Sequence, residues 1–367
     1  MKDMMLKNIH NGHGILYIDP HGSDTDDLLQ YIPYERRNDV ILFDPSDAEH
    51  PMAWNPLEIN GHIAVITSTI ERAIKDNSGY HDTGTPTMSL YIRSTICALL
   101  EAGEPITGIS FMLTSPKYRL KVLEKVQDPL IKRFWFDFET LNTKDKRQEV
   151  ASTYNKAFSL ILDQRIRNII TQKKSMFAPR DALSGKIILA RLPQGQLGFE
   201  QVRMLGLLIL SQFHLSALAH PATVPTHVYL DEVHTFDGGT LGEMLTGIRK
   251  YGVSLTMAHQ NLSQLSPKLL TTILGNTGQK YIFRVSMADS KLLNEHQGPD
   301  NINAELYELP LYVARRFEGE KLKDIPVSFD WKPDQRVPRT VWSNMRRNYC
   351  RPSEAVTAEL NRFIQSA

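Results

Sequence analysis

Short apolar runs alternate with polar, helix-forming segments in the first sixty residues of the chain. Residues 14–22 (GILYIDPHG) and 39–47 (DVILFDPSD) each hold an apolar run that ends in Asp-Pro, and an acidic helical segment lies between them. This strand–helix–strand order is typical of a parallel sheet, whose strands are apolar on both faces. Further apolar runs come much later, at 187–192, 228–230 and 253–258. The pattern therefore predicts one mostly parallel α/β sheet built from two separate parts of the chain.

The region between these two parts has a different periodicity. From 61 to 180 the apolar residues recur at helical spacing, and strand signals are weak, so we predict an all-helical domain inserted into the α/β domain. The predicted organisation is 1–60 for the first part of the α/β domain, 61–180 for the helical insertion, 181–325 for the rest of the α/β domain and 326–367 for a C-terminal segment. Pro and Arg accumulate between 326 and 352, which predicts an extended course over the surface before a short helix at 354–364.

Two adjacent carboxylates, Asp231 and Glu232, directly follow the apolar run at 228–230. A buried parallel strand delivers such acids to the carboxyl edge of its sheet, which is where open α/β sheets bind ligands. In phosphoryl-transfer enzymes the first acid of such a pair helps to hold Mg²⁺, and the second can orient the attacking water. The next strand delivers Gln260 to the same edge. An acid pair after a strand is also common without catalysis, and that alternative stays open.

Asp19 and Asp44 close two other strands of the predicted sheet. They could line a nucleotide site or shape the turns in which they lie. The proline that follows each of them favours the turn-shaping role.

A phosphate-binding loop of the form G-x-x-x-x-G-K-[ST] is missing from the sequence. In that loop the glycines let backbone N–H groups approach the phosphates, and the lysine reaches the terminal phosphate oxygens. Gly185 and Lys186 form a Gly-Lys pair, but Ile187 follows them and Arg180 stands where the first glycine belongs.

Three segments, VYLDEVHTF, GIRKYGVSLTMAHQNLSQL and ILGNTGQKYIFRVSMAD, together resemble the motor core of the type IV secretion coupling proteins. These belong to the wider group of hexameric DNA-pumping ATPases of the FtsK and HerA kind. The resemblance covers roughly residues 8–295. It implies a RecA-like P-loop NTPase core with a mostly parallel sheet, whose first strand and P-loop are missing here, and an inserted all-helical domain.

The resemblance also assigns roles to four residues, with ATP and Mg²⁺ as the cofactors of the full-length protein. Asp231 matches the Mg²⁺ acid, Glu232 the water-orienting acid and Gln260 a sensor of the γ-phosphate. Arg249 matches an arginine finger that acts across a subunit boundary, which implies a homo-hexamer. The alternative for Gln260 is a satisfied glutamine at the end of a strand. The alternative for Arg249 is a cation at a helix C-terminus that faces the helix dipole.

By the same resemblance, the phosphate-binding loop and the helix that follows it should directly precede the strand at 14–19, and the lysine of the loop should fall a few residues before Met1. We therefore expect a chain truncated within or just before the helix that follows the loop, and inactive as an ATPase alone. A late start in the gene model, a shortened chain, or loss of nucleotide binding would each explain this. An in-frame loop motif upstream of Met1 would indicate one of the first two, and an in-frame stop would indicate the third.

Charge and composition change this picture little. The net charge of +1 hides an acidic segment at 1–60 and a basic one at 117–174. In the basic segment the best nucleic-acid candidates are Arg165, Arg167, Lys173 and Lys174, with a solvated helical face as the alternative.

Other features indicate a cytoplasmic protein. The two cysteines, Cys97 and Cys350, argue against a disulfide framework and fit a reducing compartment. The apolar helix near 204–219 is broken by polar residues and predicts a core helix rather than a membrane span. The aromatic cluster at 134–138 could stack on bases, but its spacing favours core packing. The resemblance implies that a full-length protein lies at the inner face of the cell membrane, through an upstream anchor.

The function expected from this resemblance is an ATP-dependent DNA translocase that couples conjugative DNA transfer to type IV secretion. Its partners would be DNA and relaxosome or secretion-channel proteins. Two other functions stay open. One is a HerA-like DNA-processing ATPase without a secretion role, and the other is a DNA- or protein-binding module without ATPase activity.

Overall fold

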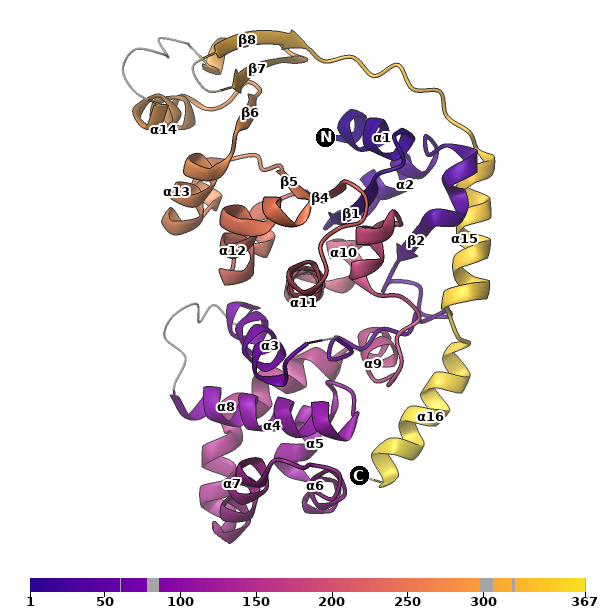
Figure 1. The fold of residues 1–367 in the computed structure, drawn as a ribbon, viewed down its shortest axis with the longest axis vertical. Helices are drawn as coiled ribbons and strands as arrows, with labels where there is room; N and C mark the ends of the chain where they lie inside the picture. Colours follow the sequence, from indigo (N-terminus) through magenta and orange to yellow (C-terminus); the bar gives the residue numbers. More distant parts are fainter. Residues whose placement is uncertain (60, 78–85, 298–305, 319–320, 367) are drawn as a thin grey trace.

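A five-stranded, fully parallel sheet forms the centre of the α/β domain (Figure 1). The computed structural model describes residues 1–59, 61–77, 86–297, 306–318 and 321–366. In spatial order the strands are β2 (Val40–Phe43), β3 (Ile187–Arg191), β1 (Gly14–Asp19), β4 (Thr226–Leu230) and β5 (Val253–Met257). The predicted α/β class and parallel sheet are confirmed, and so is the assembly of the sheet from two distant parts of the chain.

Helices cover both faces of this sheet. They are α1 (Lys2–His10), α2 (Ser23–Leu29), α10 (Gln194–Leu197), α11 (Phe199–Ala219), α12 (Gly239–Gly247) and α13 (Pro267–Asn276). Short 3₁₀ turns connect them at Tyr34–Asp39, Pro179–Ser184, Val233–Phe236, Ile248–Tyr251 and Leu262–Gln264. Helix α11 is long and apolar enough to cross a membrane, but 89% of its apolar window is buried inside the protein. The predicted core helix is therefore confirmed.

All described elements between β2 and β3 are helical, and they form a separate layer beside the α/β domain (Figure 1). They are α3 (Ile63–Asn77), α4 (Pro86–Ala102), α5 (Gly108–Thr114), α6 (Pro116–Leu123), α7 (Pro129–Thr140), α8 (Thr143–Leu162) and α9 (Gln164–Ile170). Helix α3 packs on α11 and α12 and so joins the two layers. The exact domain limits stay a prediction.

The aromatic cluster on α7 belongs mainly to the core of this helical layer. Trp135 and Phe138 are buried, and both rings contact Tyr91 on α4. Phe136 is 62% exposed. Core packing therefore explains most of the cluster, as its spacing predicted.

A small antiparallel sheet follows α13. It contains β6 (Gln279–Ile282), β7 (Val313–Glu318) and β8 (Lys321–Pro326), with α14 (Met287–Gln297) and a 3₁₀ turn (Leu306–Glu308) between β6 and β7. These three strands pair with each other and not with the central sheet.

The final segment, residues 327–366, which we call the C-terminal strap, is more helical than predicted. The extended course expected between 326 and 352 is wrong for α15 (Arg336–Tyr349), whereas the predicted final helix is present as α16 (Ser353–Ser366). Pro338 lies in the first turn of α15, where its missing N–H breaks no helical hydrogen bond. Val337, Val341 and Met345 recur every four residues and are buried against the β2 side of the sheet.

Candidate functional site

Asp231 and Glu232 leave the carboxyl end of β4, between β1 and β5. Glu232 has φ 44° and ψ 55°, the left-handed region that a residue with a side chain rarely adopts. Such strain costs roughly 1–3 kcal/mol and tends to occur at functional sites. The turn points the chain into the 3₁₀ helix Val233–Phe236 and leaves the Glu232 carboxylate at the sheet edge.

The Glu232 carboxylate is buried, with the residue 7% exposed, and only half of it is hydrogen-bonded. Its Oε1 accepts a hydrogen bond from Gln260 Nε2 at 2.5 Å. Its Oε2 has no donor within the described residues, although His234 Nδ1 lies 3.4 Å away, because the two atoms are not aligned for a hydrogen bond. His21 Nε2 lies 3.8 Å from Oε1 on the other side. A buried acceptor without a donor is costly unless a water or a ligand completes it.

Asp231 carries an unfavourable charge in this environment. Burial raises the pKa of its carboxyl group, and the nearby charges of Asp24 and Glu232 raise it further. Burial also raises the pKa of Asp24, together with the charge of Asp19. The site thus concentrates carboxylates, and the described cations that act on them include the Met1 amino group near Asp231 and Lys2 near Asp24.

Mg²⁺ fits this donor set. Among the described residues no group of three or more His, Cys, Asp or Glu is arranged to hold a metal ion by itself. Mg²⁺ in nucleotide sites needs no such cage, because one or two carboxylates bind it together with waters and phosphate oxygens. The raised pKa of Asp231 shows where an added positive charge would be favourable.

Helix α1 begins beside these acids. The charges of Asp231 and Asp24 act on the amino group of Met1, directly before Lys2. The first residues of the given sequence therefore lie within electrostatic reach of the acids that suit Mg²⁺.

The other acids of the carboxyl edge have structural partners. The Asp19 carboxylate is fully buried and accepts hydrogen bonds from the backbone N–H groups of His21, Gly22 and Thr25. Asp44 accepts from the backbone and hydroxyl of Ser46 and forms an ion pair with Arg191. The turn-shaping role favoured for both residues matches these contacts.

Gln260 and Arg249 lie at opposite ends of β5. Gln260 joins Glu232 at the carboxyl end, as the strand order predicted. Arg249 is exposed in the 3₁₀ helix before β5, and its guanidinium has no hydrogen bond or ion pair within the described part of the chain. The structure thus brings Asp231, Glu232 and Gln260 together and leaves Arg249 outside their site.

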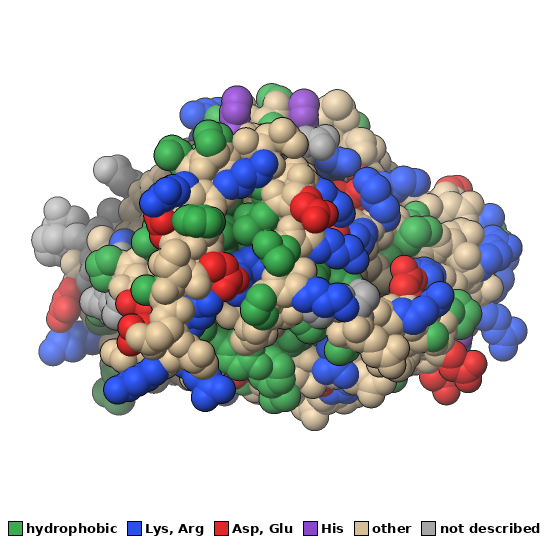
Figure 2. All heavy atoms as spheres, turned by 90° about the horizontal axis from the view of Figure 1, so that it is seen from below, with side chains coloured by type: hydrophobic (Ala, Val, Ile, Leu, Met, Phe, Trp, Pro, Cys, Tyr) green, Lys and Arg blue, Asp and Glu red, His purple; other side chains and the backbone are tan. Residues whose placement is uncertain are grey.

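The four predicted nucleic-acid residues all have partners inside the protein. Arg165 pairs with Asp163, Lys173 with Glu104 and Lys174 with Glu58, while Arg167 donates to the Ile161 carbonyl. Figure 2 shows the end of the helical layer, where Lys and Arg side chains surround a hydrophobic area and acidic side chains lie among them. A role of the four residues in nucleic-acid binding stays a prediction.

Sequence reasoning missed a buried arginine that connects the site to the helical layer. Arg203 on α11 donates to the carbonyls of Thr235 (2.6 Å), Asp237 (2.7 Å) and Asp76 (3.2 Å). The first two follow the acid pair, and the third ends α3. The Asp76 carboxylate in turn accepts from the Gly239 N–H. No sequence signal marked Arg203, because its position in an apolar helix gives no hint of the carbonyls around it.

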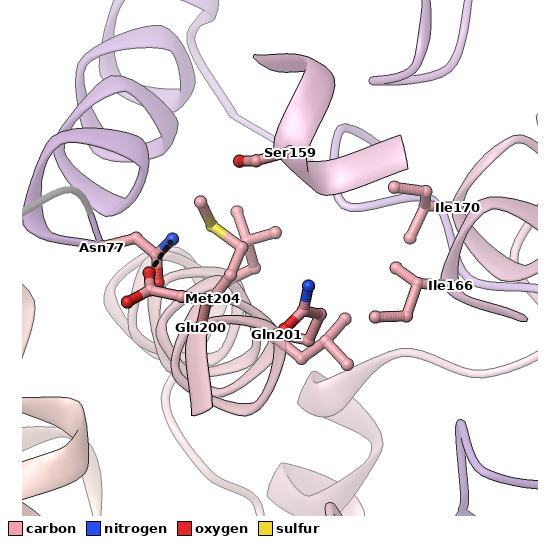
Figure 3. A pocket seen from close by; sticks show the side chains of 9 residues that line it. Asn77, Ser159, Ile166, Ile170, Glu200, Gln201 and Met204 are labelled. Carbon is pink, nitrogen blue, oxygen red and sulfur yellow. Dashed lines mark hydrogen bonds between the residues drawn. The ribbon is translucent and has the colours of Figure 1, made fainter. Parts of the chain in front are cut away.

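A small cavity lies between α11 and the helical layer (Figure 3). Its volume is about 20 Å³, with Asn77, Glu200, Met204 and Ile170 among its lining residues. Asn77 and Glu200 share a hydrogen bond of 3.5 Å at its rim. A space of this size holds a water molecule and no nucleotide.

Comparisons with known proteins identify the fold. The sequence matches no family profile, and no curated protein sequence matches it. Among solved structures, the plasmid coupling protein TrwB in complex with ADP and Mg²⁺ is similar at a TM-score of 0.59 and 16% identity, over 92% of this chain and 84% of that chain. A sulphate complex of the same bacterial conjugative coupling protein reaches 0.60 with the same identity and coverage. VirB4 of Thermoanaerobacter pseudethanolicus is similar at 0.58 and 13% identity, over 90% of this chain and 85% of that one.

These likenesses extend over nearly the whole described chain, including the helical insertion. The chain therefore has the RecA-like fold of the conjugative coupling proteins.

Proposed function

We propose that this chain is the motor domain of an ATPase that moves DNA in type IV secretion. The observation that carries the proposal is the buried Glu232 carboxylate, which has one oxygen on Gln260 and the other without a donor, next to Asp231. The fold shared with TrwB and VirB4 supports the secretion context.

Each residue of the site has a defined task in this proposal. Asp231 would hold Mg²⁺, and the ion would supply positive charge to neutralise the phosphates. The free Oε2 of Glu232 accepts a hydrogen bond from the attacking water and aligns it. Gln260 Nε2 donates to the other oxygen of Glu232, Oε1. A phosphate would compete with Oε1 for this amide N–H, so Gln260 would change partner when nucleotide binds.

The open edge of β5 supports the proposal independently. No described strand pairs with the outer side of β5, and only Val253 of this strand is buried. An exposed edge of a parallel sheet is unusual, because its backbone groups lack partners. One further parallel strand beside β5 would deliver a phosphate-binding loop to the carboxyl edge, next to Gln260.

Arg249 completes the proposal across a subunit boundary. It is exposed, has no partner within the described residues, and lies at the end of β5 opposite the acids of its own subunit. A finger that serves a neighbouring site must be unpaired and remote from its own site. A ring of identical subunits, which we propose to be a hexamer, provides that neighbour.

The test uses the open reading frame that contains this chain, expressed from its first in-frame start codon, and measures ATP hydrolysis with and without DNA. We expect hydrolysis that DNA stimulates, with Glu232→Gln lowering kcat by about 10²–10⁴-fold at unchanged ATP affinity. Full activity of Glu232→Gln refutes its role. Absence of any nucleotide binding refutes the motor proposal and leaves a binding module on the same fold.

The finger is tested by mixing subunits. Arg249→Ala should lower kcat by at least about 10³-fold and spare ATP binding, whereas Lys250→Ala, which removes the adjacent exposed cation, should not. Mixed rings of Arg249→Ala and Glu232→Gln subunits should regain activity, because some sites then hold both intact groups. Loss of ATP binding in Arg249→Ala refutes the finger.

A third test distinguishes a secretion ATPase from a DNA-processing ATPase that has no role in secretion. Deletion of the gene should abolish conjugative DNA transfer, and the parent gene should restore it while the Glu232→Gln gene does not. Normal transfer in the deletion strain refutes the secretion role.

A further inference from the structure

We propose that a groove on α15 of the C-terminal strap binds a single strand of DNA. The groove has a volume of about 580 Å³ and lies over the surface that α15 shares with the loop after β2. It is lined by His50, Arg339, Trp342, Ser343, Arg346 and Arg347. Three guanidinium groups, an imidazole, an indole ring and a hydroxyl thus line one open surface, and no acid is among them.

The arginines of the groove differ in how much of their charge is already compensated. Arg339 is exposed, and its guanidinium has no hydrogen bond or ion pair in the described part of the chain. Among the residues that the structure describes, Arg347 bonds neutral groups alone, the side-chain oxygens of Asn344 and Asn348. Arg346 pairs with Asp47 at 3.1 Å. Two of three guanidinium groups therefore lack an acid partner.

Asp47 acts as a fixed support for the third arginine. His50 Nδ1 lies 3.2 Å from the same carboxylate. Burial opposes the charge of Asp47, but His50 and Arg346 together hold the pKa of this carboxyl below its ordinary value. Arg346 also lies over the Trp342 ring, with 5.7 Å between its guanidinium carbon and the ring centroid. The ion pair and the ring contact thus orient this guanidinium beside the indole before any ligand arrives.

Arg346 and Arg347 lie in the last turn of α15, where cations also stabilise a helix through its dipole. That role does not explain Arg339, which lies two turns earlier, or the half-buried Trp342 between them. Residues 339, 342, 343, 346 and 347 recur at helical spacing and occupy one face of α15. The opposite face, with Val337 and Val341, is buried.

This combination selects a single nucleic-acid strand among anionic partners. Guanidinium groups bind phosphates, and an aromatic ring stacks on an unpaired base, whereas bases in a duplex are already stacked. A membrane surface is disfavoured, because the apolar face of α15 is buried and cannot enter lipid. The choice of DNA over RNA rests on the proposed function. Strand binding itself needs neither ATP nor the acids at the sheet edge.

The experiment measures binding of fluorescein-labelled oligothymidylate of about 15 nucleotides to the full chain by anisotropy, without nucleotide, over a series of salt concentrations. The double variant Arg339→Ala/Arg347→Ala should bind roughly tenfold more weakly, and its log–log salt slope should fall by about 1.4, because two phosphate contacts are lost. The double variant Lys332→Ala/Arg362→Ala removes the same charge from exposed positions on either side of α15 and should bind as the parent does.

Trp342 provides an independent arm. Trp342→Leu, which keeps apolar bulk but removes the ring, should weaken binding roughly tenfold, whereas Trp342→Phe should retain most of it. Circular dichroism melting verifies that each variant is folded.

Parent-like binding by the arginine variant overturns the proposal, as does an equal loss in the control pair. Tighter binding of duplex DNA, oligouridylate, polyglutamate or anionic vesicles also overturns it. If the groove binds oligothymidylate but ATP hydrolysis is absent, the proposed motor function fails and the groove assignment stands.

Discussion

The two edges of the central sheet differ in cover and in chemistry. The β2 edge is buried along its whole length, and α15 packs against it. The β5 edge is half exposed and has no partner strand among the described residues. Parallel sheets are normally covered on all sides, so the open edge is the exception that needs an explanation. We infer that the β2 edge has a structural role only, whereas the β5 edge is available for pairing with another strand.

The acids of the carboxyl edge also differ in how fully their oxygens are satisfied. Asp19, at the end of the central strand β1, and Asp44, directly after β2, receive several local donors each. Burial raises the pKa of both Asp44 and Asp231, but Asp44 has Arg191 as an ion-pair partner. Among the described residues Asp231 has no ion pair, and the neighbouring Glu232 keeps one oxygen without a donor. Acids that shape a fold are saturated by the fold itself, whereas acids that act on a ligand are left incomplete.

The largest expected effect tests the acids. Asp19→Ala removes the acceptor of three backbone N–H groups and should lower the free energy of unfolding by about 3–5 kcal/mol. Asp231→Ala, at the same edge, should change it by less than about 1 kcal/mol. Urea unfolding followed by far-ultraviolet circular dichroism measures both. Equal losses would remove the distinction between the two acids.

A second prediction compares the cover of the two edges. Val341→Ala leaves a cavity between α15 and the sheet and should cost about 2 kcal/mol of unfolding free energy. Leu255→Ala on the half-exposed β5 strand should cost about 1 kcal/mol or less, despite the larger side chain. The same urea titrations decide. A larger loss at Leu255 would show that the β5 edge is already as well packed as β2.

A third prediction concerns Mg²⁺. At about ten times its dissociation constant, Mg²⁺ should stabilise the protein by roughly 1.4 kcal/mol, provided that it binds the folded state alone. Asp231→Asn should lose this stabilisation, whereas Asp44→Asn should keep it even if its baseline stability is lower. Thermal unfolding with MgCl₂ or with NaCl of equal ionic strength separates specific binding from screening. Equal stabilisation of all three proteins would exclude a site at Asp231.

The smallest effect is a pH dependence. Because the pKa of Asp231 is raised in the folded protein, the unfolded chain ionises first as pH rises from its ordinary value of 3.8. Between pH 3.8 and the raised pKa of the folded state, the parent should therefore lose stability relative to Asp231→Asn. The loss should be less than about 1 kcal/mol, because the group is partly solvated. Above the raised pKa, the difference in stability between the two proteins should stay constant. Urea midpoints from pH 3.5 to 7 measure it. If the parent instead gains stability relative to Asp231→Asn as the pH rises, the negative charge of Asp231 stabilises the folded protein and the prediction is wrong.

The sequence was sufficient where one strand decides the position of a side chain. Asp231 and Gln260 follow adjacent apolar strands, so the parallel sheet alone brings them to one edge. The left-handed backbone of Glu232 could not be predicted, because nothing in its neighbours demands that conformation. The contacts of Arg203 were also hidden, since they depend on how α3, α11 and the loop after the acids meet in space.

The strap was mispredicted for a local reason. Proline and arginine were taken as signs of an extended segment, although Pro338 lies in a first helical turn and arginine is a good helix former. The decisive signal was the four-residue spacing of Val337, Val341 and Met345. Once this spacing is recognised as helical, it places Arg339, Trp342, Arg346 and Arg347 together on the opposite face of α15, where the groove lies.

The position of α15 against β2 has a consequence for synthesis of the protein on the ribosome. The strand β2 (Val40–Phe43) leaves the exit tunnel long before α15 (Arg336–Tyr349), the helix that packs against its edge. At roughly 5–20 residues per second, the edge stays uncovered for on the order of 15–60 s in every nascent chain. During that time it can pair with a neighbouring chain on the same messenger RNA. Faster translation from β2 to α15 therefore shortens the time in which this edge is open to such pairing.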